Sequence, residues 1–175
     1  MLSKLGGLAV AMALACGFLM VPAIAPAHAQ GPVDVECEGT YTNEFRPALT
    51  NQPQNVTIST QYSYATCVTG LPGTSSVTSV LLESCLNALH ALTPFTETIT
   101  WSDRSTSTVF WSSVQDTGGS ATFTGTVTAG RYTGDNAVKA LEALDISGTN
   151  PELCPIGEGT VSAASGSVTL TLTSL

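Results

Sequence analysis

Alternation of polar and apolar residues in the middle of the chain predicts a series of short β-strands. Between residues 96 and 128, three runs rich in Thr, Val and aromatic residues are separated by clusters of Asp, Gly and Ser. In the first run Ile99 and Trp101 share one face of a strand, and Thr98 and Thr100 share the other. This period of two is typical of strands with one buried face and one solvated face. The three runs therefore predict an antiparallel meander.

The same pattern predicts further strands on both sides of this meander. We expect strands or extended segments at 35–41, 45–49, 56–64 and 167–173, and a loop at 147–159. In the longest run, Val56 and Tyr64 share a face, whereas Cys67 has the opposite parity. A β-bulge or the end of the strand is therefore expected near Ala65.

Two stretches fit both a helix and a strand. Residues 76–92 place apolar side chains at helical spacing, but their first residues favour a strand. We predict a strand to about Ser84, followed by a helical turn over 86–92. Residues 137–144 favour a helix by composition, whereas the neighbouring strands favour one more strand.

Seven or eight short strands at regular spacing predict an all-β fold. We expect an antiparallel, immunoglobulin-like β-sandwich with one short helical turn. Once 29 residues are removed from the 175, 146 remain, enough for a single domain at 30–175.

The first 29 residues have the pattern of a cleaved signal peptide. Lys4 precedes an apolar stretch, and Ala27-His28-Ala29 fits the small-x-small cleavage rule. No second apolar span follows, so we expect secretion without a membrane span. The alternative is a lipoprotein anchored through Cys16, which follows Ala13-Leu14-Ala15.

The mature chain is strongly acidic. Removing Lys4 from the five basic residues leaves four against thirteen acidic ones, so the formal charge changes from −8 to −9. Phosphate backbones repel such a chain, so nucleic acid is excluded as a partner.

Four of the five cysteines lie outside the signal peptide, at Cys37, Cys67, Cys85 and Cys154. An even number in an exported protein predicts two disulfide bonds, whose pairing the sequence leaves open. No pair has the short C-x₂-C spacing of a zinc site. We therefore predict no metal and no cofactor.

Several local motifs carry a family resemblance. They are Cys37-Glu-Gly39, Glu83-Ser-Cys85-Leu, the segment 98–108, Gly130-Arg-Tyr-Thr-Gly134-Asp and Leu153-Cys154-Pro155. Together they resemble small secreted β-sandwich proteins of actinobacteria, of immunoglobulin-like type and largely of undetermined activity. The resemblance implies a strand at 137–144, and it implies no activity and no catalytic residue. Arg104 departs from the pattern, because a turn glycine is expected there.

No set of side chains predicts catalysis. His90 is the single histidine after residue 29, and no nucleophile motif accompanies it. Glu83, Glu97 and Asp103 could form a carboxylate pair only if the topology brought them together. Asp103, Asp116 and Asp135 lie in predicted turns, where Asp bonds its own backbone.

One strand has apolar groups on both faces. Phe110 and Trp111 point to opposite sides, so one of them is either covered or exposed for binding. Together with Tyr132 they form the candidate ligand patch.

These observations favour a secreted, disulfide-stabilised protein that is not an enzyme and acts by binding or structure at or near the cell surface. Its partner would be an extracellular protein, a glycan or a small molecule. The alternative is a small-molecule or glycan-binding module; a protease inhibitor or a secreted hydrolase is less favoured.

Overall fold

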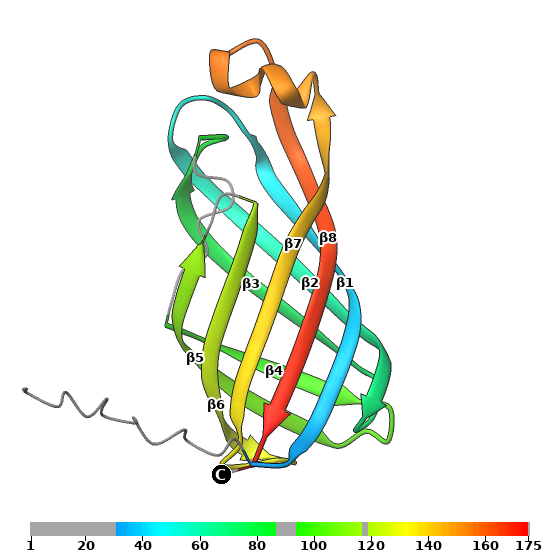
Figure 1. Ribbon diagram of the computed structural model, residues 1–175. Coiled ribbons are helices and arrows are strands. Elements are labelled where there is room, and N and C mark those ends of the chain that lie inside the picture. Colours follow the sequence, from blue (N-terminus) through cyan, green and yellow to red (C-terminus); the bar gives the residue numbers. More distant parts are fainter. Residues whose placement is uncertain (1–30, 87–93, 117–118, 175) are drawn as a thin grey trace, which may run out of the picture.

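Eight strands pair in sequence order, and the first also pairs with the last, so the sheet closes into a barrel (Figure 1). The structure is a computed structural model that describes residues 31–86, 94–116 and 119–174. Its elements are β1 (Val33–Leu49), β2 (Gln54–Thr69), β3 (Gly73–Glu83), β4 (Phe95–Trp101), β5 (Thr106–Asp116), β6 (Ser120–Gly130), β7 (Asn136–Thr149), the 3₁₀ helix η1 (Pro151–Ile156) and β8 (Thr160–Thr173). Every neighbouring pair is antiparallel.

The predicted all-β antiparallel fold is confirmed, but the sandwich is corrected to a closed barrel. β1 pairs with β8 along most of its length, from Val33 opposite Thr173 to Leu49 opposite Val161. A sandwich and a barrel both bury one face of each strand, so the alternation of residues is the same in the two folds. Closure depends on pairing between the two ends of the chain, which no local pattern records.

Most of the predicted strands are confirmed, with longer bounds than expected. The separate segments predicted at 35–41 and 45–49 form one strand, β1. The stretch 137–144 is part of β7, as the resemblance implied. In the β1–β2 ladder, Glu38 faces Thr66 and Gly39 faces Tyr64, which leaves Ala65 unpaired as the predicted bulge.

The helical turn predicted over 86–92 falls almost entirely outside the described residues and stays a prediction. β3 ends at Glu83, close to the predicted Ser84, and residues 87–93 lie outside the described residues. The short helix of the described chain is η1, in the stretch predicted as a loop. Asn150 and Gly157 adopt left-handed backbone conformations at its two ends, with φ of 44° and 88°. Pro151 follows at the start, where the lost N–H has no helical partner.

Two disulfide bonds are present, as predicted, and the structure gives their pairing. Cys37 bonds to Cys67, its partner in the β1–β2 ladder. Cys85 bonds to Cys154 and thereby attaches η1 to the chain that follows β3.

The barrel interior holds two apolar clusters. The larger one runs through the barrel and includes both tryptophans. The smaller one lies near η1 and includes Phe45, Leu49 and Val161 around the buried Cys154.

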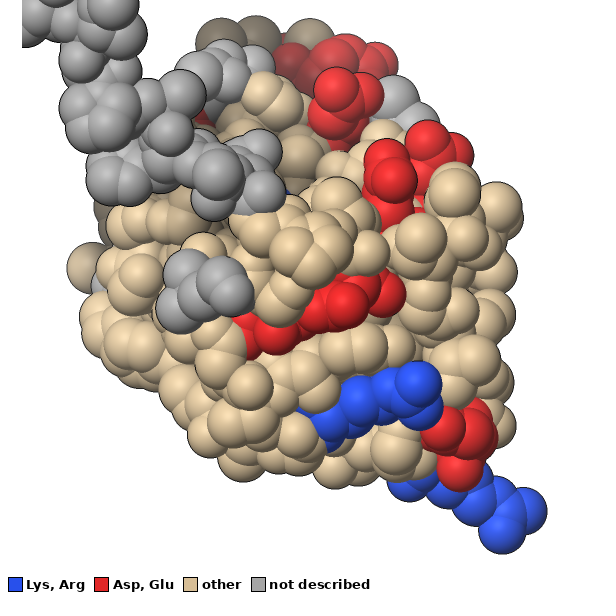
Figure 2. Space-filling view, turned by 60° about the horizontal axis from the view of Figure 1, so that its bottom comes forward, with Lys and Arg blue, Asp and Glu red and all other residues tan. Residues whose placement is uncertain are grey.

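The outer face is rich in Ser and Thr, and the side shown in Figure 2 carries mostly uncharged residues, with acidic groups in several places. In the described ranges, no helix has the length and apolarity needed to cross a membrane.

Candidate functional site

Two residues of opposite charge lie inside the barrel. Glu97 is on β4 and Lys139 on β7, and both side chains are completely buried. Lys139 Nζ lies 2.6 Å from Glu97 Oε2. A buried charge is tolerated only when it is paired and hydrogen-bonded, so the two residues depend on each other.

Every oxygen of the Glu97 carboxylate accepts two hydrogen bonds. The hydroxyls of Tyr64 and Ser75 donate to Oε1 at 2.8 and 2.5 Å. The indole N–H of Trp111 donates to Oε2 at 2.8 Å, beside the ammonium of Lys139. Four donors around one carboxylate match its ionised form, because a protonated carboxyl would leave one of them without an acceptor.

The pKa values of the pair move in the directions that this geometry requires. Burial acts to raise the pKa of Glu97, but the Lys139 charge and the donated hydrogen bonds outweigh it and hold the pKa below 4.5. Burial lowers the pKa of Lys139 below 10.5, against the attraction of Glu97, which raises it. The carboxylate and the ammonium thus stabilise each other in a dry environment.

Aromatic rings enclose the ammonium of Lys139. Its Nζ lies 4.0 Å from the ring centre of Tyr62, 4.7 Å from that of Trp111, 5.0 Å from that of Phe123 and 5.2 Å from that of Phe95. A cation within about 6 Å of a ring is attracted to its electron-rich face. The rings therefore replace the water that Lys139 loses on burial.

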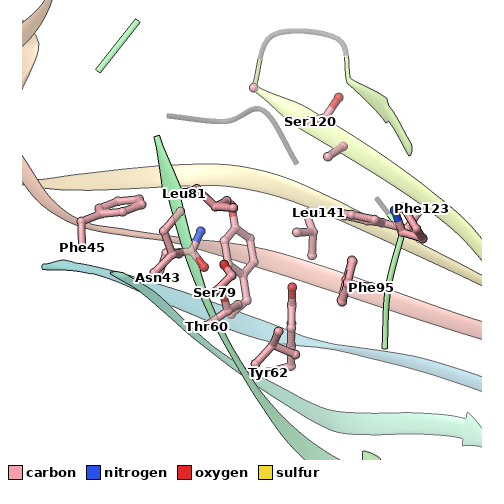
Figure 3. Close-up of a pocket in the computed structure, with 16 residues that line it drawn as sticks. Asn43, Phe45, Thr60, Tyr62, Ser79, Leu81, Phe95, Ser120, Phe123 and Leu141 are labelled. Atoms are coloured by element: carbon pink, nitrogen blue, oxygen red, sulfur yellow. The ribbon is translucent and has the colours of Figure 1, made fainter. Parts of the chain in front are cut away.

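A cavity of about 260 Å³ lies next to this group (Figure 3). Its wall is mostly apolar, and includes Phe45, Ile58, Val77, Leu81, Phe95 and Phe123. Phe95 and Phe123 contribute both to the cavity wall and to the enclosure of Lys139, as does Tyr62. The charged pair thus lies behind these rings, and none of the described residues that line the cavity is charged.

The cavity lies where the barrel wall is divided. β3 pairs with β2 over eleven residues, but with β4 over three, from Gly73 opposite Trp101 to Ser75 opposite Ile99. Beyond Ser75 the two strands separate. Val77 and Leu81 on one side of this seam and Phe95 on the other all line the cavity. Among the strand pairs of the described residues, β3 and β4 share the shortest ladder, so few backbone hydrogen bonds hold the wall closed at this seam.

The size and lining of the cavity suit one small neutral molecule. An apolar cavity of about 150 Å³ is enough to bind benzene, so about 260 Å³ has room for a two-ring molecule. Ligand sites typically measure about 300–1,000 Å³, so this cavity suits a ligand at or below the small end of that range.

The candidate patch of Trp111, Phe110 and Tyr132 does not form one surface. Trp111 is fully buried inside the barrel, whereas Phe110 lies on the outer face and is 40% exposed. Tyr132 lies in the β6–β7 turn, where its ring meets the edge of Trp101 at 5.7 Å between ring centres. Of the three, Trp111 belongs to the interior site.

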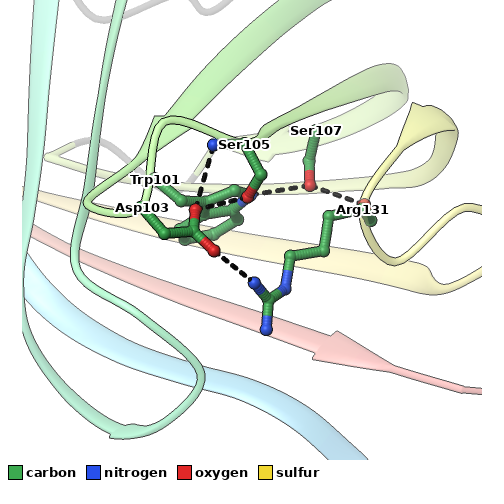
Figure 4. A network of polar contacts seen from close by, with 5 residues as sticks. All are labelled: Trp101, Asp103, Ser105, Ser107 and Arg131. Atoms are coloured by element: carbon green, nitrogen blue, oxygen red, sulfur yellow. Dashed lines mark hydrogen bonds and ion pairs between the residues drawn. The ribbon is translucent and has the colours of Figure 1, made fainter.

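The candidate carboxylates do not converge either. Asp103 lies in the exposed β4–β5 turn, where its carboxylate accepts bonds from the backbone and hydroxyl of Ser105 and pairs with Arg131 at 2.7 Å (Figure 4). Glu83 is buried at the end of β3, and Glu97 is in the barrel. His90 lies outside the described residues. In the described ranges, no group of three or more His, Cys, Asp or Glu could hold a metal ion.

Sequence reasoning missed Lys139 and misread Glu97, although a signal was present. Glu97 has the same parity as Ile99 and Trp101, and Lys139 has the same parity as Ala137 and Leu141. Each is a single charge on the apolar face of its strand, and the two charges are opposite. That combination indicates a buried ion pair, provided that the two strands face each other across an interior.

No protein-family model, no curated protein and no solved structure matches this chain.

Proposed function

We propose that this protein binds one small, neutral, largely apolar molecule inside its barrel and acts as a carrier or binding module, without turning the molecule over. The observation that carries the proposal is the cavity of about 260 Å³ between β3, β4 and the far wall of the barrel. An eight-stranded barrel is wide enough to be filled by side chains or to hold one small ligand. Here the side chains leave room.

The arrangement of charge supports a neutral ligand. Glu97 and Lys139 are neutralised by each other and enclosed by rings, so neither is available to bind a charged group in the cavity. A polysaccharide is disfavoured by the small volume of the cavity, and hydrolysis by the scatter of Glu83, Glu97 and Asp103.

Export and removal of residues 1–29 remain part of the proposal, with a lipid anchor at Cys16 as the alternative. The two disulfides suit an oxidising compartment. The resemblance to small secreted actinobacterial proteins would place the carrier outside a bacterial cell.

The test has two arms. Protein purified from its native source is compared by native and denaturing mass spectrometry, where we expect an additional small mass only in the native spectrum. The denatured mass also reports the N-terminus: a start at Gln30 supports secretion, and a diacylglycerol-sized excess at Cys16 supports the anchor.

The second arm titrates the recombinant protein with 2-methylnaphthalene and follows backbone amide signals by NMR. The variant Ala121→Leu narrows the cavity and should weaken binding, whereas Thr122→Leu, the same side chain on the outer face of β6, should not. Absence of any retained molecule together with absence of probe binding would overturn the proposal.

A further inference from the structure

Polar groups are distributed unevenly around the cavity. On the side formed by β1, β2 and β3, five of the nine lining residues can form hydrogen bonds: Tyr41, Asn43, Thr60, Tyr62 and Ser79. On the side formed by β4, β6 and β7 and their ends, the described lining residues are Pro94, Phe95, Gly119, Ser120, Ala121, Phe123 and Leu141, and of these seven Ser120 alone has a polar side chain. As far as the described residues line it, the cavity therefore has one polar wall and one apolar wall.

Three uncharged residues make a continuous stripe on the polar wall. Asn43 on β1 lies directly opposite Thr60 on β2. Ser79 on β3 lies opposite Ile58, so it is the diagonal neighbour of Thr60. Directly opposed side chains have Cβ atoms about 4.5–5.5 Å apart, and diagonal ones about 7–8 Å. Figure 3 shows the three labelled side chains together, with Phe95, Phe123 and Leu141 on the other side of the cavity.

The side chains of this stripe have hydrogen-bonding capacity that no bond among the described residues uses. Asn43 Oδ1 is buried and has no partner in the described chain. Among the bonds of the described residues, none involves the side chains of Thr60 or Ser79, whereas each oxygen of the neighbouring Glu97 accepts two. Because an unsatisfied buried acceptor is costly, Asn43 Oδ1 favours a ligand that donates a hydrogen bond to it. The hydroxyls of Thr60 and Ser79 are half-buried beside it and can bond to the same ligand.

We propose, on the basis of the proposed function, that the ligand is a neutral aromatic molecule with a hydroxyl or carbonyl group along one edge. Its rings lie against Phe95, Phe123 and Leu141, and its oxygen-bearing edge bonds to Asn43, Thr60 and Ser79. An amide and two hydroxyls can each donate and accept, so the stripe accommodates either oxygen group.

The test uses two probes of nearly the same shape, 2-naphthol and 2-methylnaphthalene, titrated at pH 7 and followed by amide NMR. The wild-type protein should bind 2-naphthol more tightly, by roughly two- to tenfold for one net hydrogen bond. Asn43→Leu and, with less change of shape, Thr60→Val should remove this preference while keeping affinity for 2-methylnaphthalene. Asn55→Leu makes the same change on the outer face of β2 and should keep the preference.

The two proposals fail in different ways. If both probes bind the wild-type protein equally, or if the preference persists in both Asn43→Leu and Thr60→Val, the polar stripe does not select the ligand. If neither probe binds the wild-type protein, the cavity is not a ligand site, and both proposals are overturned.

Discussion

Replacing Lys139 with methionine removes the cation from the Glu97 pair and keeps a side chain of similar length. Glu97 then keeps three donors, from Tyr64, Ser75 and Trp111, but loses the opposite charge. Breaking a buried ion pair by removing one partner typically costs about 3–5 kcal/mol. The cost of protonating Glu97, as an alternative to leaving it charged and unpaired, has a similar magnitude. At pH 7, protonating a carboxyl group with the ordinary pKa of 4.5 costs about 1.36 kcal/mol per pH unit, or about 3.4 kcal/mol.

Protonation of Glu97 also makes the stability lost in Lys139→Met depend on pH. In the wild-type protein the pKa of Glu97 is lowered, so its stabilising contribution is present above the unfolded value and is lost as the pH falls through the folded value. In Lys139→Met the pKa of Glu97 rises instead, because burial is no longer opposed by a positive charge. The deficit should therefore shrink by about 1.4 kcal/mol per unit as the pH is lowered from 7 towards 5.

Urea unfolding followed by tryptophan fluorescence measures these effects. The double variant Glu97→Gln/Lys139→Met, in which no charge is buried at the pair, should recover most of the loss. Arg46→Met breaks the exposed pair with Glu44 and should change the free energy of unfolding by less than about 1 kcal/mol. A Lys139→Met protein as stable as the wild-type protein at pH 7, or one whose loss of stability does not change with pH, would contradict a charged, buried pair.

Three further predictions concern single residues. Arg104 has a φ of 72°, so Arg104→Gly should relieve left-handed strain and raise the unfolding free energy by about 1 kcal/mol in urea unfolding; a loss of stability would contradict this. Burial, with a contribution from Asp34, raises the pKa of Asp135, so its ionised form destabilises the fold at pH 7. Asp135→Asn should therefore raise the melting temperature at pH 7 but not near pH 3, where the carboxyl is protonated in both the folded and the unfolded protein. An equal gain at both pH values would refute this prediction. Lys139, the only lysine after residue 29, should resist an amine-reactive ester in the folded protein and react once urea unfolds it. Peptide mass spectrometry measures the labelling. Rapid labelling under native conditions would mean that the aromatic rings around Lys139 do not exclude solvent.

The strands could be predicted because their alternation is local. The bulge at Ala65 followed from the parity of Cys67 relative to Val56 and Tyr64. Closure could not be predicted in the same way, since pairing of β1 with β8 joins residues more than a hundred positions apart. Alternation with a period of two indicates that one face of a strand is buried. It does not indicate whether that face is buried against a second sheet or inside a barrel.

The candidate site was harder to predict than the fold. The parity of Glu97 and Lys139 marks both as interior residues, but their pairing requires β4 and β7 to face each other across a closed barrel. The cavity arises because the β3–β4 ladder is shorter than β3 itself: the ladder stops at Ser75, while β3 continues to Glu83. Composition does not show where two strands separate, and the polar stripe acquires meaning only once the register places Asn43 beside Thr60.

The two disulfides should differ in what they stabilise. Cys37 and Cys67 are 30 residues apart and already neighbours in a long ladder, whereas Cys85 and Cys154 are 69 apart and connect η1 to the end of β3. In the chain-entropy model the two bonds contribute about 3.7 and 4.4 kcal/mol, a small difference.

Removal of each disulfide should affect local hydrogen exchange more differently than it affects global stability. Without the Cys85–Cys154 bond, η1 keeps few attachments, so the amides of the non-proline residues in 151–157 should exchange hydrogen much faster in Cys85→Ala/Cys154→Ala. In Cys37→Ala/Cys67→Ala the ladder of β1 with β2 and β8 remains, so exchange in η1 should stay slow and that in β1 should rise only with global unfolding. If η1 exchanges equally in both variants, then the packing of Leu49 and Val161 around it, rather than the bond, holds this end of the barrel.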